Sequence, residues 1–394
     1  MNYPRDEERL EGVRARMAAD EIDALVVSAP DNVVYLGNYW TMKGWEVLVF
    51  PREGEPTLVA VAPQAENIAR NAWVDDVRYF AGYEPADPRP PHVRALDLAV
   101  DVLVERGLDR RVGAELSGGT QGADRMVGEP TVPWKGRFDR LDSVAGELVD
   151  ATPLLTAARM RKTPQEIERL RRTNRLAGLA VDHVRAQIDA GMREPDVGGM
   201  YEAFVHSHGI GFEGTVEMAR AFTLAWSGPG ISTFTATGGR PIQPDEPTLL
   251  EIWVCADGYW NDLTKNACPG PLTAEYDRLL EQLLAIMDEA TRDYVHPGAS
   301  LAELDRVIRT RIAEAGYPGQ PSHFVCHGVG ARAHEPPWAH QAVEAEMAEG
   351  MVLAVEPGCY WDGGGGLRLE DNFLVTADGC ERLCPAPDDF RGLR

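Results

Sequence analysis

Residues 249–267 read LLEIWVCADGYWNDLTKNA, two apolar stretches separated by Asp257-Gly258. An Asp-Gly pair between such stretches favours a two-residue β-hairpin turn. With that turn, Asp262 lies opposite Trp253, and Glu251 shares the face of Trp253 because strand side chains alternate. Glu251 and Asp262 thus become diagonal neighbours across the hairpin. Two carboxylates placed in this way repel each other unless a cation lies between them.

A second hairpin is predicted around the sequence AspGlyGlyGlyGly at 362–366. Its midpoint places Glu356 almost opposite Glu370, and Arg368 shares their face. Each predicted hairpin therefore projects two carboxylates from an otherwise apolar strand. Buried carboxylates are costly unless they are paired or bind a metal. One such pair is compatible with a salt-bridge network that includes Arg368, whereas two pairs together favour a metal centre.

The segment between the two hairpins, SHFVCHGVGARAHEPP at 322–337, is rich in histidine and glycine. Its histidines are His323, His327 and His334. Gly328 and Gly330 exclude a regular helix and allow close approach of the backbone. A single histidine is most often structural, but three within this segment are also compatible with a functional site. The six other histidines have no such context, and we interpret them as structural.

The spacing of apolar residues and the turn signals before and after residue 155 predict a chain of mixed α/β (α+β) class with two domains. In the first half, residues 24–27, 45–50 and 57–62 have the composition of strands, and a helix is predicted at 93–106. Leu10, Val13 and Met17 mark one face of a further helix, Pro30–Asn32 predicts a turn, and residues 151–163 resemble a connection. Residues 1–155 therefore form an α/β domain.

The second half, residues 160–394, contains strong helix signals and long apolar strands. Thr163 to Glu166 is a capping box that opens a helix ending at Gly191, and Ser300 to Glu303 opens another. The remaining predicted elements are a helix at 273–291 and strands at 247–256, 259–267, 350–357 and 367–376. Antiparallel hairpins with helices over one face are the expected arrangement.

Composition excludes several classes of function. The chain has 394 residues and a net charge of −23, which argues against binding to nucleic acid or to anionic membranes. No apolar run is long enough to span a membrane, and the start, MNYPRDEERLEGVRARM, lacks the apolar core of a secretory signal. The six cysteines form no CxxC pair, so we expect packing residues rather than a disulfide framework. These features predict a cytoplasmic protein.

Five short motifs follow one another in the second half. They are AsnAspLeuThrLys (261–265), HisGlyValGly (327–330), HisGluProPro (334–337), GluProGlyCysTyr (356–360) and ArgLeuGluAsp (368–371). In this order and spacing they resemble the pita-bread metallopeptidases, which include methionine aminopeptidase, aminopeptidase P, prolidase and the creatinase-like enzymes. Residues 31–39 and 161–170 are similar to prolidase and creatinase relatives as well. The resemblance implies a creatinase-like N-terminal domain at 1–155 and a pita-bread domain at 160–394.

The resemblance also implies two divalent metal ions. Their ligands would be Glu251, Asp262, His327, Glu356 and Glu370. In that family pattern Asp262 and Glu370 bridge the ions, His327 and Glu356 complete one ion, and Glu251 completes the other. Such an oxygen-rich set suits Mn²⁺, with Fe²⁺, Co²⁺ or Zn²⁺ as alternatives.

The remaining roles implied by the resemblance concern the reaction. Glu356 would be the general base for a water between the ions. His334 would stabilise the oxyanion or donate a proton, and His323 would help to position the substrate. Arg368 would orient Glu370.

The chain departs from the family pattern at two places. Glu251 stands where the family usually has Asp, and Phe234 or Thr235 stands where peptidase relatives have a substrate-binding His. No His occurs between His208 and His296. The departure brings a peptide substrate into question, unless another group supplies the contact.

Three functions remain open from the sequence. The first is hydrolysis of an amide bond by an Xaa-Pro dipeptidase or an aminopeptidase-P-like enzyme, acting on short peptides. The second is a creatinase-like hydrolase or lyase with a small non-peptide substrate. The third is a non-catalytic binding protein with the same fold. The resemblance also implies a homodimer.

Overall fold

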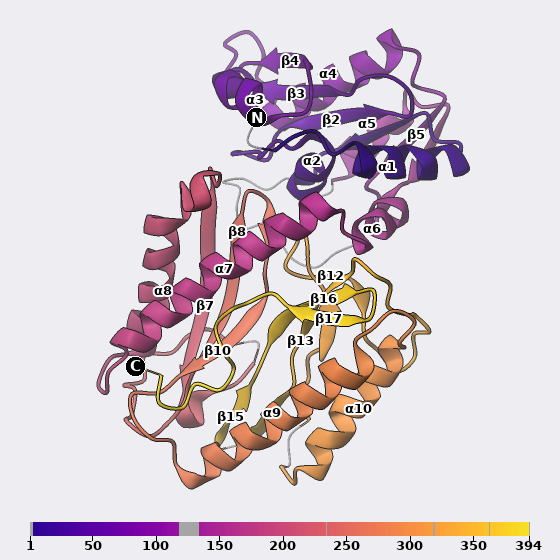
Figure 1. Ribbon diagram of the computed structural model, residues 1–394. Helices are drawn as coiled ribbons and strands as arrows, with labels where there is room; N and C mark the ends of the chain where they lie inside the picture. The colour runs from indigo at the N-terminus through magenta and orange to yellow at the C-terminus, as the bar shows by residue number, and fades with distance from the viewer. Residues whose placement is uncertain (1–2, 118–133, 234, 318–319, 362, 394) are drawn as a thin grey trace. The chain divides into compact units, whose positions relative to one another are not determined.

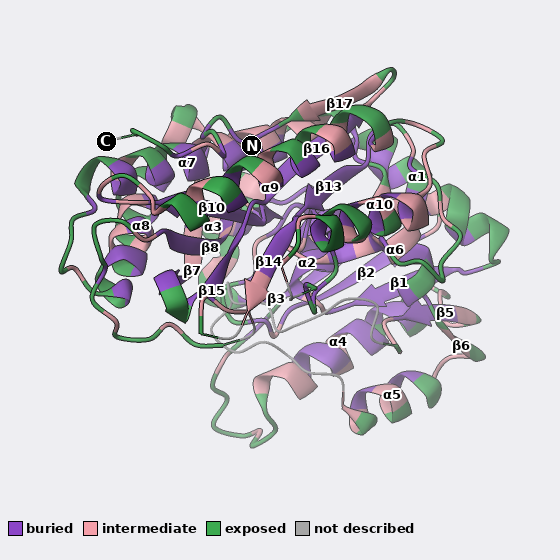
Figure 2. Cartoon of the chain, turned by 90° about the horizontal axis from the view of Figure 1, so that it is seen from below, coloured by how far each residue is buried: buried purple, intermediate pink, exposed green. Residues whose placement is uncertain are grey.

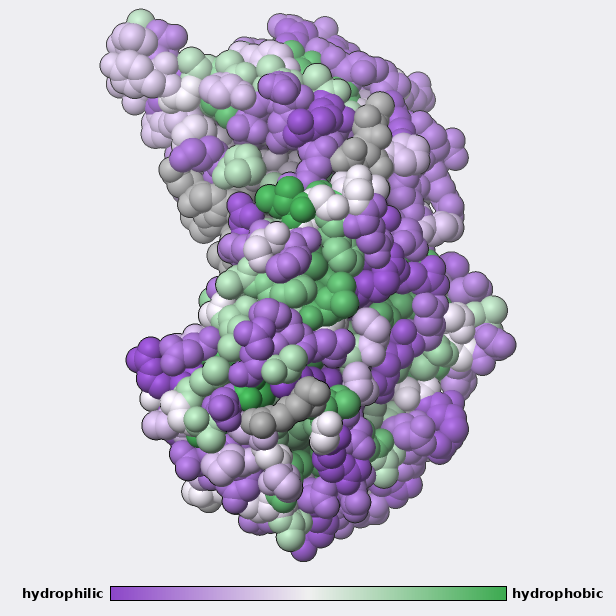
Figure 3. Space-filling model, turned by 60° about the vertical axis from the view of Figure 1, so that its left-hand side comes forward, coloured by the Kyte–Doolittle hydropathy of each residue, from purple (hydrophilic) through white to green (hydrophobic). Residues whose placement is uncertain are grey.

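The computed structural model describes residues 3–117, 134–233, 235–317, 320–361 and 363–393. The chain divides into two compact units, Met1–Arg159 and Met160–Arg394, which are described in turn (Figure 1). None of the helices in these described ranges has both the length and the apolar content needed to cross a lipid bilayer. Hydrophilic side chains cover most of the face shown in Figure 3, in keeping with the 26% of charged residues.

The first unit contains a six-stranded mixed sheet in the order β4-β3-β2-β1-β5-β6. Its strands are β1 (Ala24–Val27), β2 (Val47–Pro51), β3 (Thr57–Val61), β4 (Asp76–Phe80), β5 (Arg111–Ala114) and β6 (Glu147–Asp150). Its helices are α1 (Glu7–Ala19), α2 (Pro30–Gly37), α3 (Ala65–Asn71), α4 (Pro91–Glu105), α5 (Lys135–Asp142) and α6 (Thr152–Met160). Leu25 packs on one side of the sheet with α1, and Val26 packs on the other side with α4. The sheet is therefore covered on both faces.

One local prediction in this unit is wrong. The predicted turn at Pro30–Asn32 is the first turn of α2, because proline at a first helical position lacks only an N–H that would have no partner there. The predicted connection at 151–163 does contain the boundary between the two units, but it also contains α6, whose Leu154 and Leu155 are buried against the first core. Burial of this apolar face explains why the segment is helical.

The second unit contains two larger sheets and a two-stranded ribbon. The four-stranded sheet has the order β10-β8-β7, with β9 paired to β8, and the five-stranded sheet has the order β12-β11-β13-β16-β17. The strands are β7 (Ala219–Ser227), β8 (Thr248–Ala256), β9 (Tyr259–Trp260), β10 (Leu263–Ala267), β11 (Cys326–Gly328), β12 (Glu335–Trp338), β13 (Val352–Val355), β14 (Gly358–Trp361), β15 (Gly365–Arg368), β16 (Asp371–Thr376) and β17 (Gly379–Arg382). The ribbon is formed by β14 and β15.

The helices of this unit are α7 (Pro164–Gln187), α8 (Glu194–Gly209), α9 (Ala274–Tyr294) and α10 (Leu301–Glu314). Leu250, Ile252 and Val254 of β8 pack in one core with α7 and α8. Leu353 and Val355 of β13 pack in another core with α9 and α10. Figure 2 shows these helices with buried residues toward the strands and exposed residues on the other side. The mixed helix-and-sheet class predicted from the sequence is confirmed.

Both predicted hairpins have the expected register. β8 and β9 are joined by Asp257 and Gly258, whose φ values of 45° and 88° match the left-handed conformation of a type I′ turn. Ile252 pairs with Leu263, which puts Asp262 opposite Trp253. In the second hairpin Val355 pairs with Asp371 and Gly358 pairs with Arg368, which puts Glu356 opposite Glu370. Asp362, which the sequence predicted to belong to the turn, lies outside the described residues.

The six cysteines are free thiols. Cys326 and Cys359 are buried in the apolar core formed with α9 and α10, which confirms their prediction as packing residues. Cys255 is also fully buried.

Thr163→Ala is expected to lower the free energy of unfolding by about 1 kcal/mol, the usual contribution of a helix N-cap. The Thr163 hydroxyl accepts from the backbone N–H of Glu166 at 3.3 Å, and the Glu166 carboxylate accepts from the backbone N–H of Thr163 at 3.0 Å. Urea denaturation measures the change. Thr163→Ser keeps the acceptor and should retain most of the stability, so equal losses in the two variants would contradict this account.

Candidate metal centre

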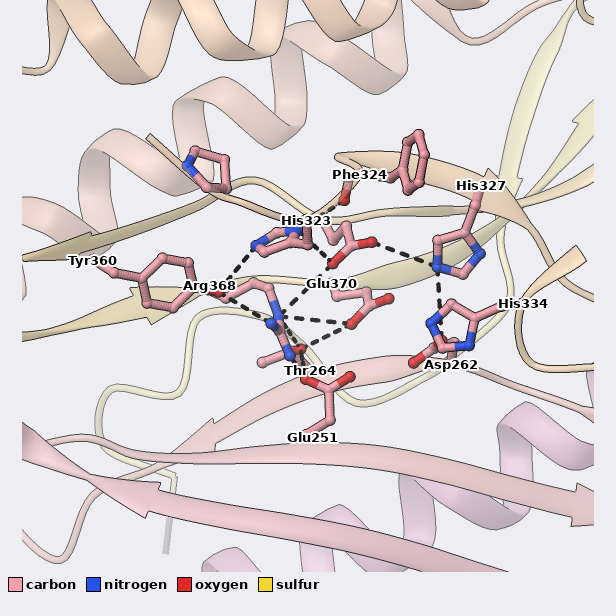
Figure 4. Close-up of polar contacts among 12 residues, drawn as sticks. Glu251, Asp262, Thr264, His323, Phe324, His327, His334, Tyr360, Arg368 and Glu370 are labelled. Atoms are coloured by element: carbon pink, nitrogen blue, oxygen red, sulfur yellow. Dashed lines mark hydrogen bonds and ion pairs between the residues drawn. The ribbon is translucent and has the colours of Figure 1, made fainter. Parts of the chain in front are cut away.

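The five predicted metal ligands come together on the second unit, although they lie on separate strands. Glu251 is on β8, Asp262 precedes β10, His327 is in β11, Glu356 follows β13, and Glu370 precedes β16 (Figure 4). Their exposed fractions are 7, 0, 1, 6 and 1% in that order. Because Leu250 and Ile252 point to the helices, alternation puts Glu251 on the opposite face of its sheet.

Donor atoms of these residues form overlapping groups of three. One donor atom each from Glu251, Asp262 and Glu370 lie within 4.8 Å of one another, and the same holds for His327, Glu356 and Glu370. Glu370 therefore belongs to both groups. A third group of this kind joins Asp262 and His327 to His334. Two acid-rich groups that share a carboxylate fit two neighbouring divalent cations.

The His327 ring is oriented for a metal by its own backbone. Its Nδ1 lies 3.0 Å from the carbonyl oxygen of Gly328, so hydrogen bonding assigns the proton to Nδ1. Its Nε2 lies 3.4 Å from Glu356 and 3.6 Å from Asp262, and in the neutral ring this nitrogen is the one that carries the lone pair for a metal. A neutral imidazole held in this tautomer is a typical metal ligand.

Burial and neighbouring charges shift the pKa of several groups in the cluster. Burial, together with the charge of Glu356, raises the pKa of Glu370 to about 7. Burial also acts to raise the pKa of Glu356, but His323 and His327 outweigh it and hold that pKa at about 2. For His323, burial acts to lower the pKa, yet the charge of Glu356 raises it overall. In the absence of metal, nearby cationic side chains thus compensate the acids.

In the metal-free protein the His323–Glu356 pair, at 3.0 Å, should stabilise the fold within a limited pH window. The depressed pKa of Glu356 gives stability above its ordinary value of 4.5 that is lost as pH falls through about 2. The raised pKa of His323 gives stability below its ordinary value of 6.5 that is lost as pH rises through the folded-state pKa. The pair should therefore contribute most between pH 4.5 and 6.5.

Melting temperatures of EDTA-treated protein and of its His323→Gln variant, recorded from about pH 4 to pH 9, measure this contribution. The difference between the two proteins should be greatest inside the window and smaller on either side. A difference that is constant across the whole range would contradict the assignment.

Arg368 reaches Glu370 through a threonine. Its Nε donates to Thr264 Oγ1 at 2.6 Å, and the Thr264 hydroxyl donates to Glu370 Oε2 at 2.8 Å. The direct distance from Arg368 Nε to Glu370 Oε2 is 3.8 Å. Arg368 also forms an ion pair with Glu251, and its Nη1 donates to the hydroxyl of Tyr360 at 3.0 Å.

Sequence reasoning missed Thr264 and Tyr360. The register offered a signal for Thr264, since Thr264 is the residue opposite Glu251 in the predicted hairpin. Tyr360 was quoted as the last residue of GluProGlyCysTyr, but its contacts to Arg368 and to His323 Nε2 at 3.1 Å depend on the tertiary fold.

The two other predicted histidines differ in exposure. His334 Nε2 lies 3.2 Å from Asp262 Oδ2, its ring stacks on His327 with a centroid distance of 4.5 Å, and 37% of its side chain is exposed. His323 is buried, and its Nδ1 contacts Glu356 and the carbonyl oxygen of Phe324. Of the two, His334 is therefore the more exposed to solvent.

Two pairs of aromatic rings lie near His334. Trp253 lies 6.1 Å from it and stacks on Phe222 at 5.5 Å, as measured between ring centroids. Trp338 lies 6.5 Å from it and contacts Phe324 at 5.0 Å. The exposed histidine of the site thus has aromatic neighbours.

The structure does not unite the predicted substrate contact with this cluster. Phe234 lies outside the described residues. Thr235 is exposed, and its predicted contact with a substrate stays a prediction.

Comparison with known proteins identifies two families. The sequence profile of metallopeptidase family M24 matches residues 168–377, and that of the creatinase/prolidase N-terminal domain matches residues 9–161. The chain is 28% identical to an Xaa-Pro dipeptidase of Lactobacillus helveticus over 377 residues, covering 94% of each sequence. It is 24% identical to an Xaa-Pro dipeptidase of Pyrococcus furiosus over 387 residues, covering 95% of this chain and 97% of that one.

Solved structures show the same fold. Prolidase from Pyrococcus horikoshii OT3 superposes with a TM-score of 0.78 at 22% identity, covering 97% of this chain and 99% of that one. Prolidase from Thermococcus sibiricus superposes with a TM-score of 0.81 at 19% identity, covering 99% and 100%. Since the first profile covers more than half of the 394 residues, the chain belongs to metallopeptidase family M24 and to the pita-bread superfamily.

Proposed function

We propose that the chain is an Xaa-Pro peptidase with two divalent metal ions, either a dipeptidase or an enzyme of the aminopeptidase P type. The observation that carries the proposal is the pair of buried donor groups that share Glu370. The names of the relatives from Lactobacillus helveticus and Pyrococcus furiosus support the same substrate class.

In this proposal Glu251, Asp262, His327, Glu356 and Glu370 would together hold the two ions. When bound, the ions would polarise the scissile carbonyl and activate a water near neutral pH. Glu356 accepts a proton from that water at a carboxylate oxygen.

The other side chains have supporting roles. His334 donates a hydrogen bond to the oxyanion or a proton to the leaving amine from its exposed ring, while His323 helps to position the substrate. Arg368 orients Glu370 through Thr264, in line with their contacts of 2.6 and 2.8 Å.

We further propose Mn²⁺ as the metal, because four carboxylates and one imidazole form a hard donor set. Fe²⁺, Co²⁺ and Zn²⁺ are the alternatives. Six free cysteines suit a reducing compartment, which supports a cytoplasmic location. Resemblance to the pita-bread enzymes supports a homodimer, which light scattering of the purified protein tests.

A panel of peptides tests the proposed function. With Mn²⁺ added, Ala-Pro and Phe-Pro should release proline, whereas Ala-Ala should not be cleaved. Cleavage of a longer peptide with proline in second position would identify the aminopeptidase P type, and its resistance would identify a dipeptidase. Absence of turnover across the panel by protein shown to contain metal would rule out the peptidase.

A creatinase-like reaction on a small non-peptide substrate is the second candidate. Two features favour it: Glu251, which stands where the family usually has Asp, is paired with Arg368, and no His occurs between His208 and His296. Turnover of creatine, ectoine or a related solute, with no release of proline from peptides, would establish it. A non-catalytic binding role is disfavoured because all five ligand positions are filled by side chains that can bind metal.

A further inference from the structure

The two hairpins that supply the acids belong to different hydrogen-bonded sheets. β10 is an edge strand of the four-stranded sheet, whereas β16 lies within the five-stranded sheet. Between these neighbouring strands, the described residues make one backbone bridge, from the N–H of Glu370 to the carbonyl oxygen of Thr264 at 3.3 Å. We call this boundary the seam. Asp262 and Glu370 stand on its two sides.

Along the seam, hydrogen bonds from side chains take the place of the backbone hydrogen bonds that would pair two strands. Asn372 donates from Nδ2 to the carbonyl oxygen of Asp262 at 2.7 Å and accepts from the N–H of Asp262 at 3.3 Å. Asn266 donates from Nδ2 to the carbonyl oxygen of Arg368 at 2.9 Å. Both asparagines are buried. The position of Asp262 relative to the second hairpin therefore depends on side-chain contacts.

A buried ion-pair group spans the seam. Lys265 of β10 donates from Nζ to Asp371 Oδ2 at 2.7 Å and to Asp388 Oδ1 at 2.6 Å. Arg382 of β17 pairs with Asp388 at 2.9 Å and with Asp371 at 3.6 Å. We call these four residues the clasp. Lys265 follows Thr264 and Asp371 follows Glu370, so the alternation of side chains puts the clasp on the reverse face from the metal ligands.

Three of the four clasp residues are buried. The side chains of Lys265, Asp371 and Asp388 are 0, 0 and 1% exposed, whereas that of Arg382 is 36% exposed, and two cations balance two carboxylates. Such groups are costly to desolvate and tolerate little displacement, because each charge must keep its partners. Apolar side chains would fill the same space without fixing β10 against β16 to within a hydrogen-bond length.

We propose that the clasp positions the metal centre, by holding β10 and β16 at the separation at which Asp262 and Glu370 can bind the same ions. Through Asp388, the clasp also involves the C-terminal segment that follows β17. Arg185 of α7 secures that segment by donating to the carbonyl oxygens of Asn266 at 3.0 Å and Pro387 at 2.9 Å. The proposal rests on the proposed function only in requiring that metal is bound.

Lys265→Met and Asp388→Asn test the proposal, with Lys265→Arg as the conservative variant. The matched control is Glu166→Gln, which removes another buried carboxylate of the same unit, one that accepts from Tyr259 at 2.9 Å away from the seam. Calorimetric titration with Mn²⁺ gives the number and affinity of bound ions. The visible spectrum of Co²⁺-substituted protein reports their coordination, and melting temperatures report stability.

Lys265→Met and Asp388→Asn should weaken metal binding by about 10-fold or more, as loss of groups that orient metal ligands usually does, and should change the Co²⁺ spectrum. Lys265→Arg should keep the metal affinity and the Co²⁺ spectrum close to those of the wild type. Glu166→Gln should lower the melting temperature and leave the spectrum unchanged.

Two results would overturn the proposal. The first is that Asp388→Asn, and Lys265→Met if that variant folds, both keep the metal affinity and the Co²⁺ spectrum of the wild type. The second is a spectral change of equal size in Glu166→Gln. That result would mean that the clasp contributes only to the general stability of the fold. Both leave the proposed function intact, whereas failure of the wild-type protein to bind any metal would remove the function and the proposal together.

Discussion

Glu370→Gln is expected to lower kcat/KM for an Xaa-Pro dipeptide by about 10³-fold, because metal assistance contributes several kcal/mol to the transition state. Glu370 is a carboxylate shared by the two acid-rich donor groups, and it is 1% exposed. Glutamine has the same shape but no charge, so both ions lose an anionic ligand. Metal content measured by mass spectrometry should fall below two ions per chain.

Glu381→Gln is the matched control for this variant. Glu381 lies on β17 and pairs with Arg171, with 42% of its side chain exposed. It should keep wild-type metal content and activity. Full metal content in Glu370→Gln together with wild-type kcat/KM would contradict the assignment of Glu370 as a ligand.

His334→Ala is expected to lower kcat by about 10²- to 10³-fold, the usual effect of removing one donor to a developing oxyanion. The imidazole is the exposed polar group next to the acids, and its Nε2 lies 3.2 Å from Asp262. KM and metal content should change little, because the five proposed ligands remain. Steady-state kinetics on Phe-Pro, with metal analysis of the same sample, measure both.

His296→Ala is the control, since His296 is exposed and contacts the carbonyl oxygen of its neighbour Pro297. It should behave as the wild type does. His334 also belongs to a donor group with Asp262 and His327. If His334→Ala loses metal in proportion to activity, His334 is a ligand rather than an oxyanion donor.

The hairpins could be predicted from sequence because their determinants are local. Asp257-Gly258 fixes one turn, and alternation of side chains then places Glu251 diagonally across from Asp262. The midpoint of the glycine-rich turn similarly placed Glu356 opposite Glu370. Neither inference showed that the two hairpins would meet. That expectation came from the resemblance to a family.

The contacts that support the proposed metal ligands could not be predicted from local sequence patterns. Lys265 and Asp388 are far apart in the chain, and no periodic pattern shows that two charged residues will be buried together. Thr264 acts through Arg368 and Glu370, which belong to the other hairpin. The helix that begins at Pro30 was not predicted because its first residues have the composition of a turn. Packing of the following residues, which the local pattern does not show, extends that turn into α2.

The division of the donor groups between two sheets also determines when an ion can be acquired during synthesis. Glu251 and Asp262 belong to the earlier hairpin, but His327, Glu356 and Glu370 come from later strands, and the clasp closes only at Asp388. A nascent chain that stops before these strands offers an ion only two carboxylates. Because a metal site forms only with the fold that builds it, the proposed centre would be complete only after these later strands have been made.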